Sequence, residues 1–176
     1  MREWSLSEFA MHLAEVAATE AVEIQHGLGR AAEIVEKAAK KRLGHYHRAV
    51  GPFPGWVPLA PVTRADRVRK GYTPNDPLLR SGELRDHITH DVHGFEAMIG
   101  VKGEGADENG TDIGDIATYM ELGTENVPPR PYLGPAAYRN RKKVGLILAE
   151  SAVAGFVGGR ALPHRLGYNM EAVAEE

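Results

Sequence analysis

Apolar residues recur at helical spacing in the first forty positions of the chain. Leu6, Phe9, Leu13 and Val16 follow one another at steps of three or four residues, as one face of a helix requires. Ser5 with Glu8 forms the pattern of a capping box, in which each side chain satisfies a free backbone N–H of the other residue. The pattern therefore predicts a helix that begins near Ser5, either as a core helix or as an arm that packs on a neighbouring subunit.

A second helical pattern follows and ends at Leu43; its apolar positions are Ala31, Ile34, Val35, Ala38, Ala39 and Leu43. Gly27 and Gly29 lie between the two patterns. Each glycine inside a helix costs about 1 kcal/mol relative to alanine. We therefore expect a kink or a break at these glycines, within an amino-terminal helical segment covering residues 1–43.

The segment from Gly44 to Pro77 is rich in proline and shows little periodicity, so we predict a long loop. Trp56 and Leu59 are expected to anchor this loop to the core. Its basic residues are Arg64, Arg67, Arg69 and Lys70. They predict either a solvated face or a contact with an acidic neighbour or DNA phosphates.

Alternating apolar residues then predict two antiparallel strands joined at Gly94. Leu84, Ile88 and Val92 share one face of the first strand, although their spacing also fits a helix. The apolar positions of the second strand are Phe95, Ala97, Ile99 and Val101. The acidic, glycine-rich stretch from Lys102 to Gly114 is predicted to be a loop, since it contains too little apolar surface to order itself.

The stretch from Ile113 to Tyr138 combines a helix end, an extended crossing and a helix start. Asp112 or Asp115 can cap a short helix whose apolar contacts come from Ile116, Tyr119, Met120 and Leu122, and Gly123 can end it in a left-handed conformation. Pro128, Pro129 and Pro131 force an extended chain around Arg130, whose guanidinium is expected to bind a carboxylate or backbone carbonyls. Gly134 and Pro135 then begin a new helix.

That last helix is predicted to run from Pro135 to about Val157, with basic first turns and an apolar remainder. A helix that is apolar nearly all round must be covered, here in part by another subunit. The predicted fold is α+β, with a long amino-terminal helix, a small mostly antiparallel sheet and a long carboxy-terminal helix packed on the sheet. The predicted core domain spans residues 44–158, and residues 159–176 form a flexible extension.

Composition narrows the functional classes. The chain has 176 residues, a formal net charge of −3 and no cysteine. The charge argues against a dedicated nucleic-acid binder, and the absence of cysteine excludes disulfides and cysteine-based zinc sites. The amino terminus predicts no secretory signal, and the most apolar run is too short and polar to span a bilayer.

Histidines suggest one chemical alternative. On a strand, His87, Asp91 and His93 would share one face. His45 and His47 lie on a loop that could approach this face. Histidine and carboxylate are metal ligands, so the alternative function is a metal site in a small histidine-based metallohydrolase. A solvent-facing strand produces the same alternation without any ligand. The loop Gly103–Gly110 lacks the oxygen ligands of a calcium loop, and Ser81 lacks the context of a nucleophile. No catalytic, cofactor-binding or metal residue is assigned, and no cofactor is expected.

Three motifs in order resemble the tail-completion, or neck, proteins of long-tailed bacteriophages, often described as phage virion morphogenesis proteins. The first motif is Trp56–Ala60 with Thr63 and Lys70, and the second is Pro77–Leu84. The third motif comprises Ala117, Tyr119, Glu121–Thr124 and Pro128–Ala136. The resemblance covers roughly residues 27 to 158; the insert Gly103–Gly114, the tail and the amino-terminal segment depart from it. Its structural or interface residues are Trp56, Leu84, Tyr119, Leu122, Gly123, Pro129, Arg130, Pro131, Tyr132 and Pro135.

The resemblance implies a structural virion protein rather than an enzyme. It implies a homo-oligomeric ring, a hexamer in this family, that surrounds the DNA channel and contacts genomic DNA without sequence specificity. Its partners would be the head-side connector or stopper protein and the tail terminator or tail tube protein, with no membrane. Assembly would take place in the host cytoplasm and the final location would be the virion. A tail terminator or another tail assembly factor is the alternative within the structural class.

Overall fold

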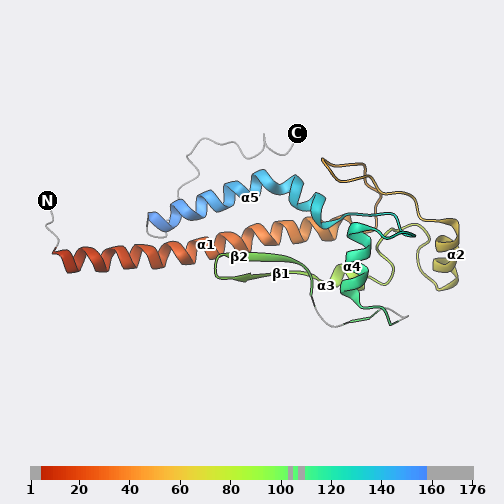
Figure 1. Cartoon of the computed structure of the whole chain (residues 1–176), viewed down its shortest axis with the longest axis horizontal. Coiled ribbons are helices and arrows are strands. Elements are labelled where there is room, and N and C mark those ends of the chain that lie inside the picture. The colour runs from red at the N-terminus through yellow and green to blue at the C-terminus, as the bar shows by residue number, and fades with distance from the viewer. Residues whose placement is uncertain (1–4, 103–104, 107–109, 158–176) are drawn as a thin grey trace. The chain divides into compact units, whose positions relative to one another are not determined.

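The computed structural model describes residues 5–102, 105–106 and 110–157. Its elements are α1 (Leu6–Arg42), α2 (Pro61–Arg69), α3 (Glu83–His87), β1 (Ile88–His93), β2 (Glu96–Val101), α4 (Ile113–Leu122) and α5 (Leu133–Phe156). β1 and β2 form one antiparallel two-stranded sheet (Figure 1). The predicted α+β class and the order of its main elements are confirmed.

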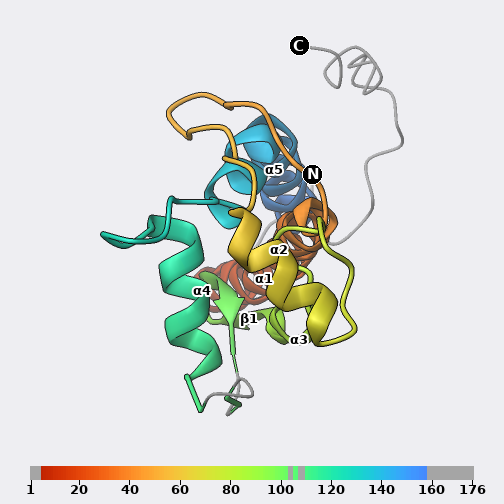
Figure 2. The same cartoon turned by 90° about the vertical axis from the view of Figure 1, so that its right-hand side faces the viewer.

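The chain divides into two compact units. Of the described residues, unit 1 contains 5–32, 91–97 and 141–157, and unit 2 contains 33–90, 98–102, 105–106 and 110–140. Three elements, α1, α5 and the hairpin, contribute to both units. The elements α2, α3 and α4 belong to unit 2 and face the viewer in Figure 2.

In unit 1, α5 packs against α1. The sequence predicted that this helix packs on the sheet instead. The two helices approach closely at Gly27 and at Gly155: a Cβ on Gly27 would overlap Ser151, and a Cβ on Gly155 would lie 2.5 Å from the Cα of Glu20. Arg30 Nη2 also donates to Ser151 Oγ at 2.9 Å. Glycine at these positions therefore lets two backbones approach more closely than any side chain would permit.

The predicted kink or break at Gly27 and Gly29 was wrong, because α1 continues through both residues to Arg42. Gly27 lies where α5 needs space, so the packing that its missing side chain permits offsets its low helix propensity. The predicted capping box is confirmed: Ser5 N donates to Glu8 Oε2 at 2.8 Å, and Glu8 N donates to Ser5 Oγ at 3.2 Å.

In unit 2, apolar side chains from α1, α3, α4, α5, β1 and the segments between them form the core. Its buried members include Val35, Ala39, Leu43, Trp56, Leu59, Leu84, Ile88, Ile113, Ala117, Tyr132 and Ala136. The sequence extended the first strand from Leu84, but residues 83–87 form α3 and β1 begins at Ile88. Leu84 is buried although it lies in a helix and not in a strand, because residues four apart, such as Leu84 and Ile88, also share one face of a helix. The predicted anchors Trp56 and Leu59 are both buried.

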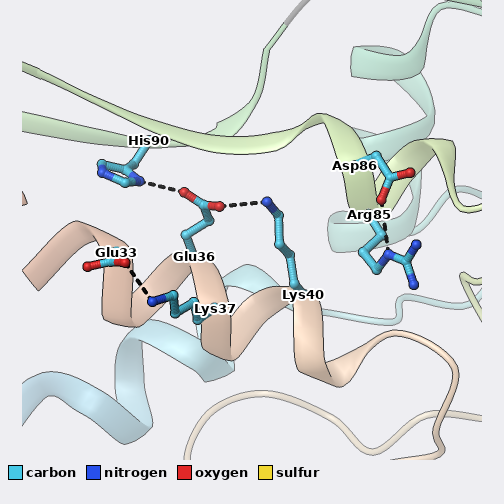
Figure 3. A network of polar contacts seen from close by, with 7 residues as sticks. All are labelled: Glu33, Glu36, Lys37, Lys40, Arg85, Asp86 and His90. Carbon is cyan, nitrogen blue, oxygen red and sulfur yellow. Dashed lines mark hydrogen bonds and ion pairs between the residues drawn. The ribbon is translucent and has the colours of Figure 1, made fainter. Parts of the chain in front are cut away.

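A polar network in unit 2 connects α1 to β1 (Figure 3). The half-buried carboxylate of Glu36 accepts a hydrogen bond from Lys40 Nζ at 2.6 Å and contacts His90 Nδ1 at 2.5 Å. Burial alone would raise the pKa of Glu36, but the hydrogen bonds from Lys40 and His90 outweigh burial, so the pKa lies below its ordinary value. Folding therefore favours the ionised form of Glu36.

Replacing Glu36 with glutamine should reduce the free energy of unfolding by about 1–3 kcal/mol, because Lys40 and His90 lose an ionised acceptor in a half-buried place. Glu33→Gln is the matched control: Glu33 is exposed and, among the described residues, pairs with exposed Lys37, so this variant should unfold at nearly the wild-type urea concentration. Urea denaturation measures both values.

The effect of Glu36→Gln should also depend on pH. Since the pKa of Glu36 is lower in the folded protein than its ordinary value of 4.5, its ionisation stabilises the fold above that pH. This advantage should disappear as the pH falls through the lowered value. An equal difference between wild type and variant at neutral and strongly acidic pH would contradict the assigned network.

Candidate functional site

The Ile113–Tyr138 stretch, here called the corner, begins with a capped helix. Asp112 Oδ1 accepts hydrogen bonds from Gly114 N at 2.7 Å and from Asp115 N at 3.4 Å, so Asp112 is the cap. α4 ends at Leu122, and Gly123 follows with φ of +80°. A Cβ on Gly123 would lie 2.9 Å from both Cδ and N of Pro129. Glycine is therefore required at this position by conformation and by space.

Glu121 connects the end of α4 to the start of α5. Its Oε2 accepts hydrogen bonds from Tyr132 N at 2.7 Å and Leu133 N at 3.0 Å, and its Oε1 accepts one from Gly134 N at 2.8 Å. The first N–H groups of a helix have no partner within the helix and carry a partial positive charge. One carboxylate therefore satisfies three such groups and fixes where α5 begins.

Arg130 crosses the corner between its prolines and is buried. Its backbone N–H donates to Met120 O at 2.7 Å, and its Nη2 donates to Val57 O at 3.1 Å. In return, Trp56 Nε1 donates to Pro131 O at 3.0 Å. The prediction that Arg130 binds backbone carbonyls is confirmed, and these bonds join the corner to the proline-rich segment.

Arg42, at the end of α1, lies against the same tryptophan. Its Cζ is 5.8 Å from the centre of the Trp56 ring, and the His47 ring meets that ring edge-on at 4.8 Å. His47 Nε2 also contacts Arg42 O at 2.8 Å. Burial lowers the pKa of His47, as do the neighbouring charges of Arg42 and Arg139, so its neutral form is favoured.

Arg67 organises the proline-rich segment, which is not the structureless loop that the sequence predicted. α2 occupies part of it, and the buried Arg67 donates to Thr73 O at 2.9 Å, Asp76 O at 2.8 Å and Leu79 O at 2.6 Å. The interpretation of Arg67 as part of a solvated basic face was therefore wrong. Burial lowers the pKa of Arg67, and three carbonyl acceptors compensate its donors.

The residues that the resemblance selected fall into two groups. Trp56, Leu84, Arg130, Pro131, Tyr132 and Pro135 are buried, and Gly123 and Pro129 are half-buried. Tyr119 and Leu122 were predicted to supply apolar contacts, but both are exposed, Leu122 at 73%. Both lie on α4, whose buried face is formed instead by Ile113 and Ala117.

The predicted metal residues make other contacts. His87 Nδ1 contacts Glu83 O at 2.9 Å, while His93 Nε2 lies 3.3 Å from Asp91 Oδ2. His47 packs on Trp56. Across residues 5–102, 105–106 and 110–157, no three His, Cys, Asp or Glu side chains gather in a way that could hold a metal ion. The loop Gly103–Gly110 and the extension 159–176 lie partly or wholly outside the described residues.

The sequence did not predict the contacts that three residues make in and around the corner: Glu121, Arg42 and Arg67. Each contacts residues that lie well away from it in the sequence, and Glu121 entered the sequence analysis only as a member of the third motif, without a predicted role. The arrangement contains buried cations, backbone acceptors and a helix cap.

Within the described part of the chain, no helix is long and apolar enough to cross a membrane. Comparisons of the chain with models of protein families, with curated proteins and with solved structures find no match.

Replacing Glu121 with glutamine should lower the free energy of unfolding by about 2–4 kcal/mol, because the amide removes the charge and one acceptor from three helix-start N–H groups. Glu125→Gln, an exposed site in the same corner, is the control and should change stability by less than about 0.5 kcal/mol. Equal unfolding midpoints for the two variants in urea would refute the role of Glu121.

Replacing Arg130 with alanine should lower the free energy of unfolding by about 1–3 kcal/mol, since Val57 O would lose its donor in a partly buried place. Arg64→Ala, an exposed arginine on α2, removes the same charge as a control. Thermal unfolding followed by circular dichroism compares the two variants. An unchanged melting temperature for Arg130→Ala would mean that the bond to Val57 contributes nothing.

Proposed function

We propose that this chain is a structural subunit of the neck of a long-tailed bacteriophage. Copies of it form a ring around the DNA channel, between the head-side connector and the tail. The resemblance carried by the three sequence motifs is the starting point. The arrangement of these motifs in unit 2 is the observation that supports the proposal most.

The three motifs meet in one core although they lie far apart in the sequence. The first and third exchange hydrogen bonds, from Trp56 to Pro131 O and from Arg130 to Val57 O. In the second motif, Leu79 O accepts from Arg67, and Leu84 is buried in α3, which contacts α4 of the third motif. Residues that carry a resemblance and also form one core support a common fold better than any motif alone.

The chemistry of the described residues also favours a structural role over an enzymatic one. The buried charged side chains Arg42, Arg67 and Arg130 contact backbone carbonyls or an aromatic ring. A ring subunit needs a rigid domain and exposed apolar positions that neighbouring subunits can cover. Exposed Tyr119 and Leu122 on α4 supply such positions in unit 2.

The mild net charge of −3 is compatible with a channel that DNA passes through. Phosphate contacts bind DNA strongly and without sequence specificity, so a strongly basic wall would retain the genome rather than let it pass. The proposal therefore includes contact with DNA in transit, without a dedicated binding site.

Electron microscopy of the purified protein, together with light scattering, tests the proposal. We expect closed rings of uniform diameter, and for a hexamer a mass about six times the chain mass of 19.2 kDa. Antibody labelling should place the protein at the head–tail junction of purified phage particles. A protein that stays monomeric at high concentration and is also absent from purified particles would contradict the neck assignment.

A further inference from the structure

Arg42 is a buried cation whose guanidinium has no hydrogen-bond acceptor in the part of the chain that the structure describes. The residue is 6% exposed, and its Nε is buried without a hydrogen-bond partner. No described residue bonds its two terminal nitrogens either, so these nitrogens lie at the surface. Arg67, by comparison, donates to three backbone carbonyls. Burying a cation without an acceptor costs free energy, and an acceptor from outside the chain would offset that cost.

The Arg42 side chain is already held in place for such an acceptor. Its Cζ lies 5.8 Å from the centre of the Trp56 ring, so the ring supports the guanidinium. Trp56 is itself buried and donates from Nε1 to Pro131 O at 3.0 Å. A guanidinium that packs on a fixed ring presents its N–H groups as an ordered planar fork, and it loses little conformational entropy when it binds.

The charges that act on Arg42 come from a second arginine and from a carboxylate that is already in use. Burial lowers the pKa of Arg42 and the charge of Arg139 lowers it further, while the charge of Glu121 raises it. Both oxygens of Glu121 accept hydrogen bonds from backbone N–H groups at the start of α5. Glu121 therefore does not serve as the missing acceptor, and two arginines remain close to each other.

The two chain segments that meet here contain no acidic residue. The chain has 24 aspartates and glutamates, yet none of them occurs in residues 37–65 or in residues 126–140. The two segments are joined in unit 2, since Arg130 Nη2 donates to Val57 O at 3.1 Å. A region that carries arginines without carboxylates attracts anions, even on a protein whose net charge is −3.

We propose that Arg42 is the centre of a binding site for an oxyanion, namely a phosphate or carboxylate group. The N–H groups of a guanidinium match two oxygens of such a group and bond them in parallel. Exposed Arg139 supplies a second positive charge. Because only the tip of Arg42 reaches the surface, the ligand is a small anion from solution or one side-chain carboxylate of a second copy. This site goes beyond the proposed function and does not depend on it.

A titration with inorganic phosphate tests the site in the full-length protein by nuclear magnetic resonance. Phosphate replaces chloride at constant ionic strength, and the Nε–H signals of the arginine side chains are followed. The signal of Arg42 should shift to saturation, whereas the signal of Arg64, an exposed arginine on α2, should not. An Arg42 signal that does not shift, or that shifts linearly without saturation, would overturn the inference.

Thermal unfolding of matched variants separates a specific site from a general salt effect. Phosphate should raise the melting temperature of wild type and of the control Arg64→Met, because a ligand that binds only the folded state stabilises it. Arg42→Met loses charged hydrogen-bond donors and should need at least about tenfold more phosphate for the same rise. An equal rise in all three proteins would contradict the site.

His47 provides a readout in the wild-type protein, which requires no variant to fold. The charged and titratable groups that act on His47 are Arg42, Arg139 and His45. Burial lowers the pKa of His47, and these charges lower it as well, so an anion bound at Arg42 should raise it. His47 should therefore titrate at a higher pH in phosphate than in chloride of equal ionic strength. Equal midpoints in the two salts would show that no anion binds at Arg42.

Dilution identifies the source of the oxyanion. If a carboxylate of a second copy occupies the site, the Arg42 signal should change with protein concentration in chloride, and phosphate should weaken self-association. If the ligand is a small anion from solution, the Arg42 signal in chloride should not depend on protein concentration, and the phosphate titration should still saturate. Either result supports the site and assigns its occupant.

Discussion

The carboxylate of Glu121 is the contact on which the geometry of the corner depends. It accepts hydrogen bonds from three consecutive N–H groups, those of Tyr132, Leu133 and Gly134, at the start of α5. Because Glu121 itself lies in the last turn of α4, one side chain determines both where α5 begins and its relation to α4 in unit 2. The prolines between the two helices restrict the backbone conformations of the connecting segment, but they do not determine a single conformation.

Elsewhere in unit 2, buried guanidinium groups also satisfy backbone groups that lack a backbone partner. Arg130 and Arg67 donate to the carbonyls of segments that have few backbone partners of their own, and Trp56 donates to Pro131. Burial of a cation costs free energy, which its hydrogen bonds must offset. A proline-rich segment loses many backbone donors, so its carbonyls need donors from side chains. Arginine, with five N–H groups in a fixed fork, supplies several from one position.

Local signals were readable from the sequence, and contacts between distant residues were not. The capping box at Ser5 and Glu8, the Asp112 cap and the positive φ of Gly123 each follow from residues within one turn of one another. The path of residues 44–77 depends on Arg67, and the continuity of α1 depends on the fit of Gly27 to Ser151. From residue type alone, Arg67 is expected to be a surface charge and Gly27 a helix breaker. The carbonyls that Arg67 binds, and Ser151, which Gly27 faces, are not adjacent to these residues in the sequence. The bonds from Glu121 to the start of α5 were not predicted for the same reason.

Amide hydrogen exchange, measured by nuclear magnetic resonance on the wild-type protein, tests the role of Glu121 most directly. If its carboxylate holds the start of α5, the N–H groups of Tyr132, Leu133 and Gly134 should exchange only when unit 2 unfolds, although no backbone acceptor within a helix is available to them. The amide of exposed Glu125 should exchange orders of magnitude faster. Fast exchange of all three helix-start amides in the folded protein would contradict the account.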